Sequence, residues 1–132
     1  MTDKIVYKSG YKYQLQENYT VFTGIIPERL INTEYLILTL NGLLTIRRGY
    51  AWDGPSGPAI DTVNFMRGSL VHDGLCQLMR ELYLDRTQHL DSAARLLQKM
   101  CIEDGMTKLR AWWVYQGVKL FGNVDADPAD NK

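Results

Sequence analysis

The 132-residue sequence has no excess charge of either sign and no hydrophobic run long enough to cross a membrane. Fifteen Lys and Arg residues balance fifteen Asp and Glu residues, so the chain as a whole has no electrostatic attraction to nucleic acid or to anionic lipid. No apolar segment approaches the ~20 residues that a transmembrane helix needs. The opening MTDKIVYKSG has no charged start followed by an apolar run, so we expect no secretion signal.

Cysteine is scarce, and the motifs of several enzyme classes are missing. Cys76 and Cys101 have no metal-ligand spacing, and we expect reduced, buried thiols, with a disulfide between two helices as the alternative. The sequence contains no phosphate-binding loop, dinucleotide fingerprint or serine-nucleophile elbow. Basic residues such as Lys12, Arg47 and Arg48 are too sparse for a nucleic-acid surface.

The first half of the chain has the pattern of antiparallel strands. Residues 11–16 and 19–25 alternate polar and apolar side chains and are rich in Tyr, Val and Thr, which favours strands exposed on one face. Asn41-Gly42 lies between the apolar runs 34–40 and 43–52. This dipeptide predicts a β-hairpin with a type I′ turn, because both central residues must tolerate a positive φ.

The second half predicts three helices. Asn64 is a candidate N-cap for the first helix, which should end within residues 81–86. Asp85 and Gln88 have the spacing of a capping box for the second helix, and Gly105 suits the left-handed position after its end. The third helix covers residues 107–122. The buried face of the first helix is expected at Phe65, Val71, Leu75, Leu78 and Leu82.

Strands followed by helices indicate an α+β fold. We predict one α+β domain over residues 1–122, in which a small antiparallel β-sheet from the N-terminal half packs against three α-helices. Residues 123–132 are polar and are expected to form a flexible tail.

A histidine and an aspartate stand side by side in the first helix. His72 lies about 100° from Val71, at the border of the apolar face, where an imidazole can be half desolvated. A short connection makes the first two helices antiparallel, which brings Asp91 or Arg95 opposite His72. A carboxylate there would fix the tautomer, so His72 is a candidate general base and Asp91 its orienting residue. The alternative is a helix-edge histidine without a catalytic role.

The glycine-rich loop WDGPSGP precedes this helix and is a candidate metal site. Gly54 and Gly57 can turn their carbonyl groups inward because they lack a Cβ. Together with the carboxylate of Asp73, and charge from Asp53 or Asp61, these oxygens would suit Ca²⁺. Calcium is therefore the candidate cofactor. The alternative is a tight connection whose glycines serve only the backbone geometry.

The third helix is unusually aromatic. It carries Trp112 and Trp113 with cationic residues on either side, and three interpretations are open. The apolar side chains can pack in the core from both sides, which is the interpretation we favour. They can instead form a protein-protein contact, because Trp and Arg dominate binding hot spots, or an interfacial helix at a membrane surface. Trp52 and Asp53, in the loop, form a second candidate binding surface.

Three segments together resemble a known family. The loop WDGPSGP, the His-Asp pair and the late helix with WW-Y-GV-LFG spacing are similar to a family of tailed phages and prophages catalogued as domain of unknown function 1353. The resemblance covers nearly the whole chain. It implies a phage-encoded protein, in the virion or in the infected host cytoplasm, with a phage or host protein as its partner.

The loop and the His-Asp pair also resemble a catalytic site. Secreted phospholipases of the A2 class and the related parvoviral domain combine a glycine-rich calcium loop, a His-Asp pair and a later aspartate in the same order. The resemblance implies that His72 activates water, Asp73 binds calcium and Asp91 holds the histidine. It covers about a third of the chain, and Cys76 stands where those enzymes usually carry an aromatic residue. Two functions follow: a virion-associated or accessory protein that works by protein-protein binding, and a calcium-dependent hydrolase.

Overall fold

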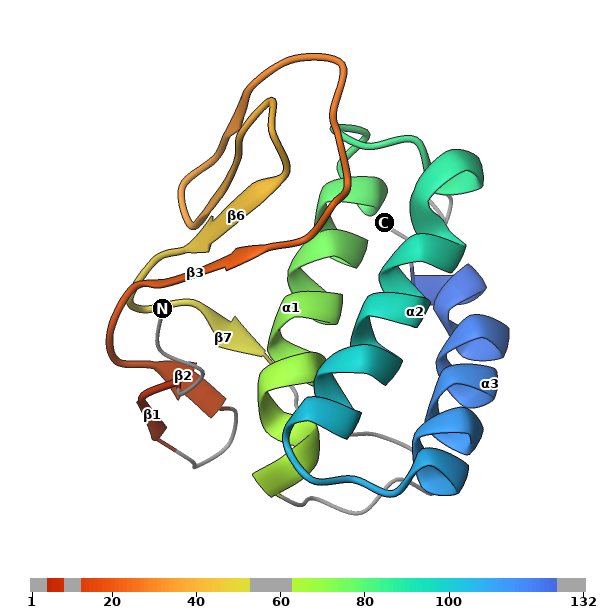
Figure 1. Ribbon diagram of the computed structural model, residues 1–132. Coiled ribbons are helices and arrows are strands. Elements are labelled where there is room, and N and C mark those ends of the chain that lie inside the picture. Colours follow the sequence, from red (N-terminus) through yellow and green to blue (C-terminus); the bar gives the residue numbers. More distant parts are fainter. Residues whose placement is uncertain (1–4, 9–12, 53–62, 126–132) are drawn as a thin grey trace. The chain divides into compact units, whose positions relative to one another are not determined.

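The computed structural model describes residues 5–8, 13–52 and 63–125 of the chain. The chain divides into two compact units, residues 1–54 and residues 55–132. The strands of the described residues all lie in the first unit and the helices in the second (Figure 1). The predicted α+β class is therefore confirmed. No helix in the described ranges combines the length and the hydrophobicity that crossing a bilayer requires.

Among its described residues the first unit contains two antiparallel sheets instead of one. The smaller sheet has the order β1-β2-β7, and the larger has the order β3-β6-β5-β4. Their strands are β1 (Tyr7–Lys8), β2 (Tyr13–Leu15), β3 (Tyr19–Phe22), β4 (Ile31–Asn32), β5 (Leu36–Leu38), β6 (Leu43–Ile46) and β7 (Ala51–Trp52).

The predicted period of two is confirmed in β3. Tyr19 and Val21 are buried, whereas Thr20 and Phe22 are exposed. Thr20 pairs with Thr45 of β6 on the exposed face, where their hydroxyl groups are 2.8 Å apart. Such cross-strand pairs and the buried apolar face together fix the register, because a shift of one residue would exchange the two faces.

The hairpin between β5 and β6 is confirmed, but its turn is not the predicted type I′. Gly42 has a φ of +88°, whereas Asn41 is outside the left-handed region. The Gly42 amide donates to the Thr39 carbonyl (3.0 Å), and the Thr39 amide donates to the Leu43 carbonyl (2.9 Å). A type I turn followed by one left-handed glycine has this geometry. The Thr39 hydroxyl explains the difference, because it bonds both the Leu43 amide and the Asn41 side chain.

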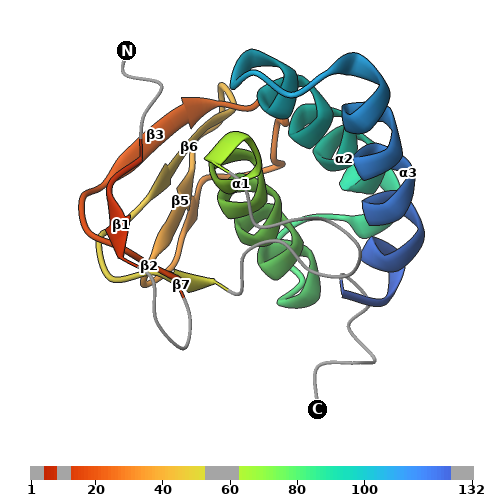
Figure 2. The same ribbon diagram turned by 90° about the horizontal axis from the view of Figure 1, so that it is seen from below.

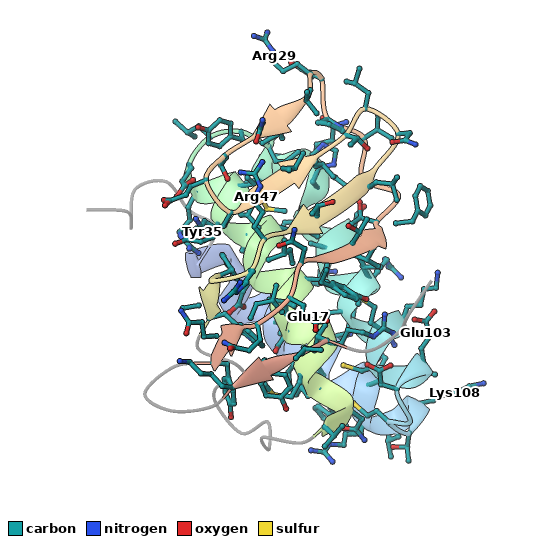
Figure 3. The ribbon with its side chains drawn as sticks, turned by 90° about the vertical axis from the view of Figure 1, so that its left-hand side faces the viewer. Glu17, Arg29, Tyr35, Arg47, Glu103 and Lys108 are labelled. Carbon is teal, nitrogen blue, oxygen red and sulfur yellow. The ribbon has the colours of Figure 1, made fainter. Side chains whose placement is uncertain are left out.

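Arg47, at the end of β6, is used inside the first unit. Its guanidinium donates to the carbonyl groups of Thr33 (3.1 Å) and Glu34 (2.9 Å), which belong to the turn between β4 and β5. Figure 3 labels Arg47 near the middle of the view and Arg29 at its top. Arg47 therefore holds two strand ends together.

The described part of the second unit forms three helices: α1 (Val63–Arg80), α2 (Arg86–Glu103) and α3 (Lys108–Asp125). They lie side by side, and α2 packs against both of the others (Figures 1 and 2). Three predicted boundaries were wrong: α1 ends at Arg80, before the expected residues 81–86, and the other two concern its start and the end of α3. Helix α1 begins at Val63, so Asn64 lies within the first turn, and α3 continues past Gly122. Leu82 follows the end of α1, has a φ of +68° and is exposed, so it is not part of the buried face.

The predicted ends of α2 are confirmed at Asp85 and Gly105, but the described residues show no capping-box bond between Asp85 and Gln88. The Asp85 carboxylate accepts a hydrogen bond from the Thr87 amide (2.9 Å) and caps the start of the helix. At the other end Gly105 has a φ of +104°, and its amide donates to the Ile102 carbonyl. The next amide donates to the carbonyl of Cys101. These two bonds form a Schellman motif, which satisfies carbonyl groups at the helix end.

Helix α1 is buried around most of its circumference and contacts α2 closely. A Cβ added to Gly68 would lie 2.6 Å from Leu97 Cδ1 and 3.4 Å from Cys101 Sγ, so glycine allows this approach. The buried Arg67 guanidinium binds Asp104 (2.9 Å) and Glu103 (2.8 Å) at the end of α2. Apolar contact and ion pairing together fix α1 against α2.

Candidate functional site

His72 lies inside the helical unit and not at the border of its core. The residue is 6% exposed, whereas we predicted a half-desolvated position. Helix geometry explains the difference: His72 follows Gly68 by four residues, so both lie on the side of α1 that faces α2. The His72 ring lies 3.7 Å from Cys76 Sγ, one turn further along. Burial lowers the pKa of His72 from 6.5 to about 4.

Asp91 binds residues of α2 and α3. Its carboxylate accepts hydrogen bonds from the Tyr115 hydroxyl (2.5 Å) and from Arg95 Nε (2.8 Å), and Lys119 Nζ lies 3.5 Å away. The hydrogen bonds from Tyr115 and Arg95 lower the pKa of Asp91 below its ordinary value. Arg95, the other residue predicted to face His72, forms its ion pair with this same Asp91 carboxylate. Asp91 therefore links α2 to α3.

Within the described residues, no hydrogen bond joins His72 to Asp91 or to another carboxylate. The imidazole is kept neutral by burial, and the carboxylate is already occupied by a phenol and two cations. A general base needs a partner that raises its basicity and access to the proton it removes. This part of the chain provides neither to His72.

The predicted calcium loop falls outside the described residues, which exclude Asp53, Gly54, Gly57 and Asp61. Asp73, the fifth predicted ligand, lies on α1 and is half-buried. In the ranges that the structure describes, no three His, Cys, Asp or Glu side chains group together as a metal site would require.

Trp52, predicted as a binding residue, belongs to an aromatic cluster of the first unit. It is 2% exposed. Its ring lies 5.8 Å from that of Tyr7 in an edge-to-face arrangement and 5.6 Å from that of Tyr13. Edge-to-face aromatic pairs stabilise a core beyond the area that they bury. Trp52 therefore connects β7 to its neighbouring strands in the smaller sheet and is not an open contact residue.

The other predicted binding residues, Trp112 and Trp113, lie on the exposed side of α3. Trp112, Trp113 and Gln116 follow Leu109 by three, four and seven residues, so all four lie on one side of the helix. Leu109 is 70% exposed, Trp112 44% and Trp113 63%, and Gln116 is exposed. The two indole rings meet edge to face at 5.0 Å. We call these four residues the α3 aromatic face.

The opposite side of α3 packs into the helical unit. Ala111 and Tyr115 are buried, and the partly buried Val114 and Val118 pack against a core cluster that includes Phe65 and Leu97. The Tyr115 hydroxyl reaches Asp91, and its ring lies under the cations of Arg95 (5.2 Å) and Lys119 (5.5 Å). These contacts fix the rotation of α3 about its own axis. The aromatic face is thereby kept outward, contrary to the core packing that we favoured from the sequence.

Both cysteines are free and buried, which confirms the prediction of reduced, internal thiols. Burial, with a smaller effect of the nearby Asp104 carboxylate, raises the pKa of Cys101 to about 12. A thiol with so high a pKa is a poor nucleophile, because only the thiolate reacts. Cys101 therefore acts as a small apolar residue of the α1–α2 contact.

Sequence reasoning missed the role of Tyr115. The pairing of Asp91 with Arg95 is visible as an i, i+4 spacing, but no local pattern connects either residue to α3. Tyr115 lies four residues after Ala111 on the buried side, and this spacing is the only signal for its orientation. A tyrosine on a buried face needs a partner for its hydroxyl group, which could have pointed to a carboxylate on α2.

Comparisons of the chain with protein-family models, with curated proteins and with solved structures found no match.

Proposed function

We propose that this chain is a binding protein and that the α3 aromatic face is its contact surface for a protein partner. One observation carries the proposal. Two adjacent tryptophans and a leucine are exposed on one side of a helix whose other side is buried and anchored. Exposed apolar side chains that cluster mark interaction sites more often than isolated ones do.

The composition of the face supports a protein as the partner. Tryptophan is enriched in binding hot spots because it buries a large area with few rotatable bonds. Trp112 and Trp113 stand on a helix that is fixed by Tyr115 and Asp91, so little conformational entropy is lost when they are covered. The resemblance to a phage family supports a phage or host protein as the partner, in the virion or in the infected cytoplasm.

The alternative function, calcium-dependent hydrolysis, lacks a comparable observation. It depends on a histidine held by a carboxylate and open to substrate. His72 is buried beside Cys76, and Asp91 bonds to Tyr115 and Arg95. We therefore propose binding alone.

The experiment places a photo-crosslinking amino acid at Gln116, in the middle of the face, and at Tyr83 as a control. Tyr83 is an exposed aromatic residue in the connection between α1 and α2. Crosslinking is carried out in the cells that produce the protein. The captured partner is then purified, and calorimetry measures its affinity for the wild type, for the variant Trp112→Ala/Trp113→Ala and for Tyr83→Ala.

The double variant should weaken binding by about 30-fold or more, because one hot-spot tryptophan contributes about 2 kcal/mol or more. Tyr83→Ala should bind as the wild type does. Equal capture from the two positions would contradict the proposal, and so would an unchanged affinity of the double variant. Circular dichroism of each variant shows whether the helices remain folded.

A further inference from the structure

The borders of the α3 aromatic face are cationic. Helical residues advance by about 100° each, so Lys108 and Lys119 border the face beside Trp112, and Arg110 borders it beside Trp113. The sequence has no acidic residue between Lys108 and Val124. The three cations therefore surround an apolar surface with no carboxylate on the same helix segment.

Two of these cations have no acidic partner in the part of the chain that the structure describes. Lys119 lies 3.5 Å from Asp91, but neither Lys108 nor Arg110 forms an ion pair with any of the residues that the structure describes. The nearest acidic residues along the chain, Glu103 and Asp104, already bind Arg67. Figure 3 shows Lys108 extending from the start of α3 away from the helices. Lys108 is exposed and open to a partner, whereas Arg110 is half-buried and near enough to Cys101 to affect its pKa, so its charge is open only in part.

The position of Lys108 is also electrostatically unfavourable for the free helix. It stands in the first turn of α3, where the helix dipole favours negative charge and disfavours cations. This turn carries two cations and no acidic residue. An acidic group of a partner near this end would interact favourably both with the cations and with the helix dipole.

We propose that the partner of the α3 aromatic face is an acidic protein segment, in which apolar side chains cover Trp112 and Trp113 and carboxylates pair with Lys108 and Arg110. The inference rests on the proposed function and adds the charge of the partner. Because the whole chain is neutral, the attraction comes from this local arrangement.

Gln116 favours a protein over an anionic membrane. It lies within the face, between the positions of Trp112 and Trp113, and it is exposed. A lipid surface that covered the tryptophans would also cover this amide, and hydrocarbon offers it no hydrogen-bond partner. A protein segment can supply a backbone or side-chain group. The face also has only three apolar side chains, a small area for lipid anchoring.

The test uses a synthetic helical peptide in which Leu and Phe form one face and Glu and Asp the other. The probes for comparison are the same peptide with Lys in place of the acidic residues, and phosphatidylcholine vesicles containing phosphatidylglycerol. Calorimetry reports binding for every variant, because Trp112→Ala/Trp113→Ala lacks the two solvent-exposed indoles from which a fluorescence signal would come. The full chain is used throughout.

The charge-reversal variant is Lys108→Glu/Arg110→Glu. Its matched control is Lys8→Glu/Arg29→Glu, which changes the net charge equally at two exposed residues of the first unit. Acidic residues suit the first turn of a helix, so the test variant should keep its fold. The acidic peptide should bind the wild type and the control alike. It should bind the charge-reversal variant about tenfold or more weakly, and higher salt should reduce this difference.

The outcomes separate the two proposals. If Trp112→Ala/Trp113→Ala abolishes peptide binding while charge reversal leaves it unchanged, the face binds but the inference of an acidic partner is overturned. If neither change affects peptide binding, the proposed contact surface itself is wrong. Binding of the vesicles or of the lysine peptide in preference to the acidic peptide, or no binding of the acidic peptide at all, also overturns the inference.

Discussion

The buried imidazole of His72 should make the protein lose stability between neutral and mildly acidic pH. In the unfolded chain the ring is hydrated and has its ordinary pKa of 6.5, whereas burial lowers the pKa to about 4 in the folded chain. Between these two values the unfolded state binds a proton that the folded state rejects. The contribution of His72 is therefore fully present above pH 6.5 and is lost as the pH falls toward 4.

The magnitude follows from the difference between the two pKa values. At about 1.4 kcal/mol per pH unit, the change from 6.5 to about 4 corresponds to about 3 kcal/mol when the loss is complete. About 2 kcal/mol of this should already be lost at pH 5. Asp91 contributes little to the loss at that pH, because its pKa is held below the ordinary 3.8 and it remains ionised.

The assay is urea unfolding followed by circular dichroism at about pH 7.5 and about pH 5. His72→Leu replaces the imidazole with an apolar side chain of similar size, which a buried position accepts. His89→Leu is the matched control, because His89 is the other histidine of the chain and is only half-buried, in the first turn of α2.

Wild type and His89→Leu should lose about 2 kcal/mol more on acidification than His72→Leu does. An independent check is an NMR titration of the His72 ring protons, which should not move between pH 8 and about pH 5. If all three proteins lose the same free energy of unfolding, or if the His72 resonance titrates near pH 6.5, the burial argument is refuted. The position of the ring in the helical unit would then be in error.

Three further outcomes follow from contacts in the helical unit. Gly68→Ala places a Cβ 2.6 Å from Leu97 Cδ1 and should lower the free energy of unfolding by about 1–3 kcal/mol. Gly117→Ala, whose Cβ would have no atom within 4 Å, should raise it by about 0.5–1 kcal/mol. Urea unfolding measures both changes, and changes in the same direction would contradict the prediction. Tyr115→Phe removes a hydrogen bond to Asp91 and should cost about 1 kcal/mol, and an unchanged melting temperature would show that the bond does not stabilise the packing of α3. Both cysteines should react with a thiol reagent at pH 8 only after unfolding, and rapid labelling of the folded protein would contradict their burial.

The sequence predicted best the local backbone features, such as helix ends, that depend on one residue and its immediate neighbours. Asp85 caps α2 because its carboxylate can reach an amide two residues away, and Gly105 ends the helix because it tolerates a positive φ. The Asn-Gly hairpin shows the limit of such reasoning. The sequence located the turn, but the hydroxyl group of Thr39 selects its type.

The side of α1 on which His72 lies could not be read from the sequence. The expected stripe through Val71, Leu75 and Leu78 is indeed buried, but so is every residue from Phe65 to His72. The first half of the helix is buried all round and has no polar face, and the half-buried residues Asp73, Gln77 and Arg80 share one side only over the last two turns. Gly68 marks the side of α1 that packs closely on α2, because only glycine leaves room for this contact. From the sequence alone this could not be recognised, since a single glycine in a helical pattern has several possible explanations.

Helix α3 presents the same ambiguity on two apolar sides, and polar contacts resolve it. Ala111, Tyr115 and Val118 form one side, and Leu109, Trp112 and Trp113 form the other, so apolar patterning alone would allow either to be buried. Burying the second side would cover more apolar area, yet it is the first that packs inward. The hydrogen bond from Tyr115 to Asp91 and the two cations over the tyrosine ring exist only in the observed rotation.

Asp91, whose carboxylate the sequence suggested for catalysis, therefore determines instead which side of α3 is buried. By binding Tyr115, Asp91 holds the smaller apolar side of α3 in the unit and leaves the two tryptophans outside. A free chain that exposes its larger apolar side gives up hydrophobic stabilisation. This arrangement is expected where the exposed side has a partner to cover it. The anchoring of α3 and the proposed binding surface are two consequences of one helix rotation, so a change that weakens the anchor should also weaken binding.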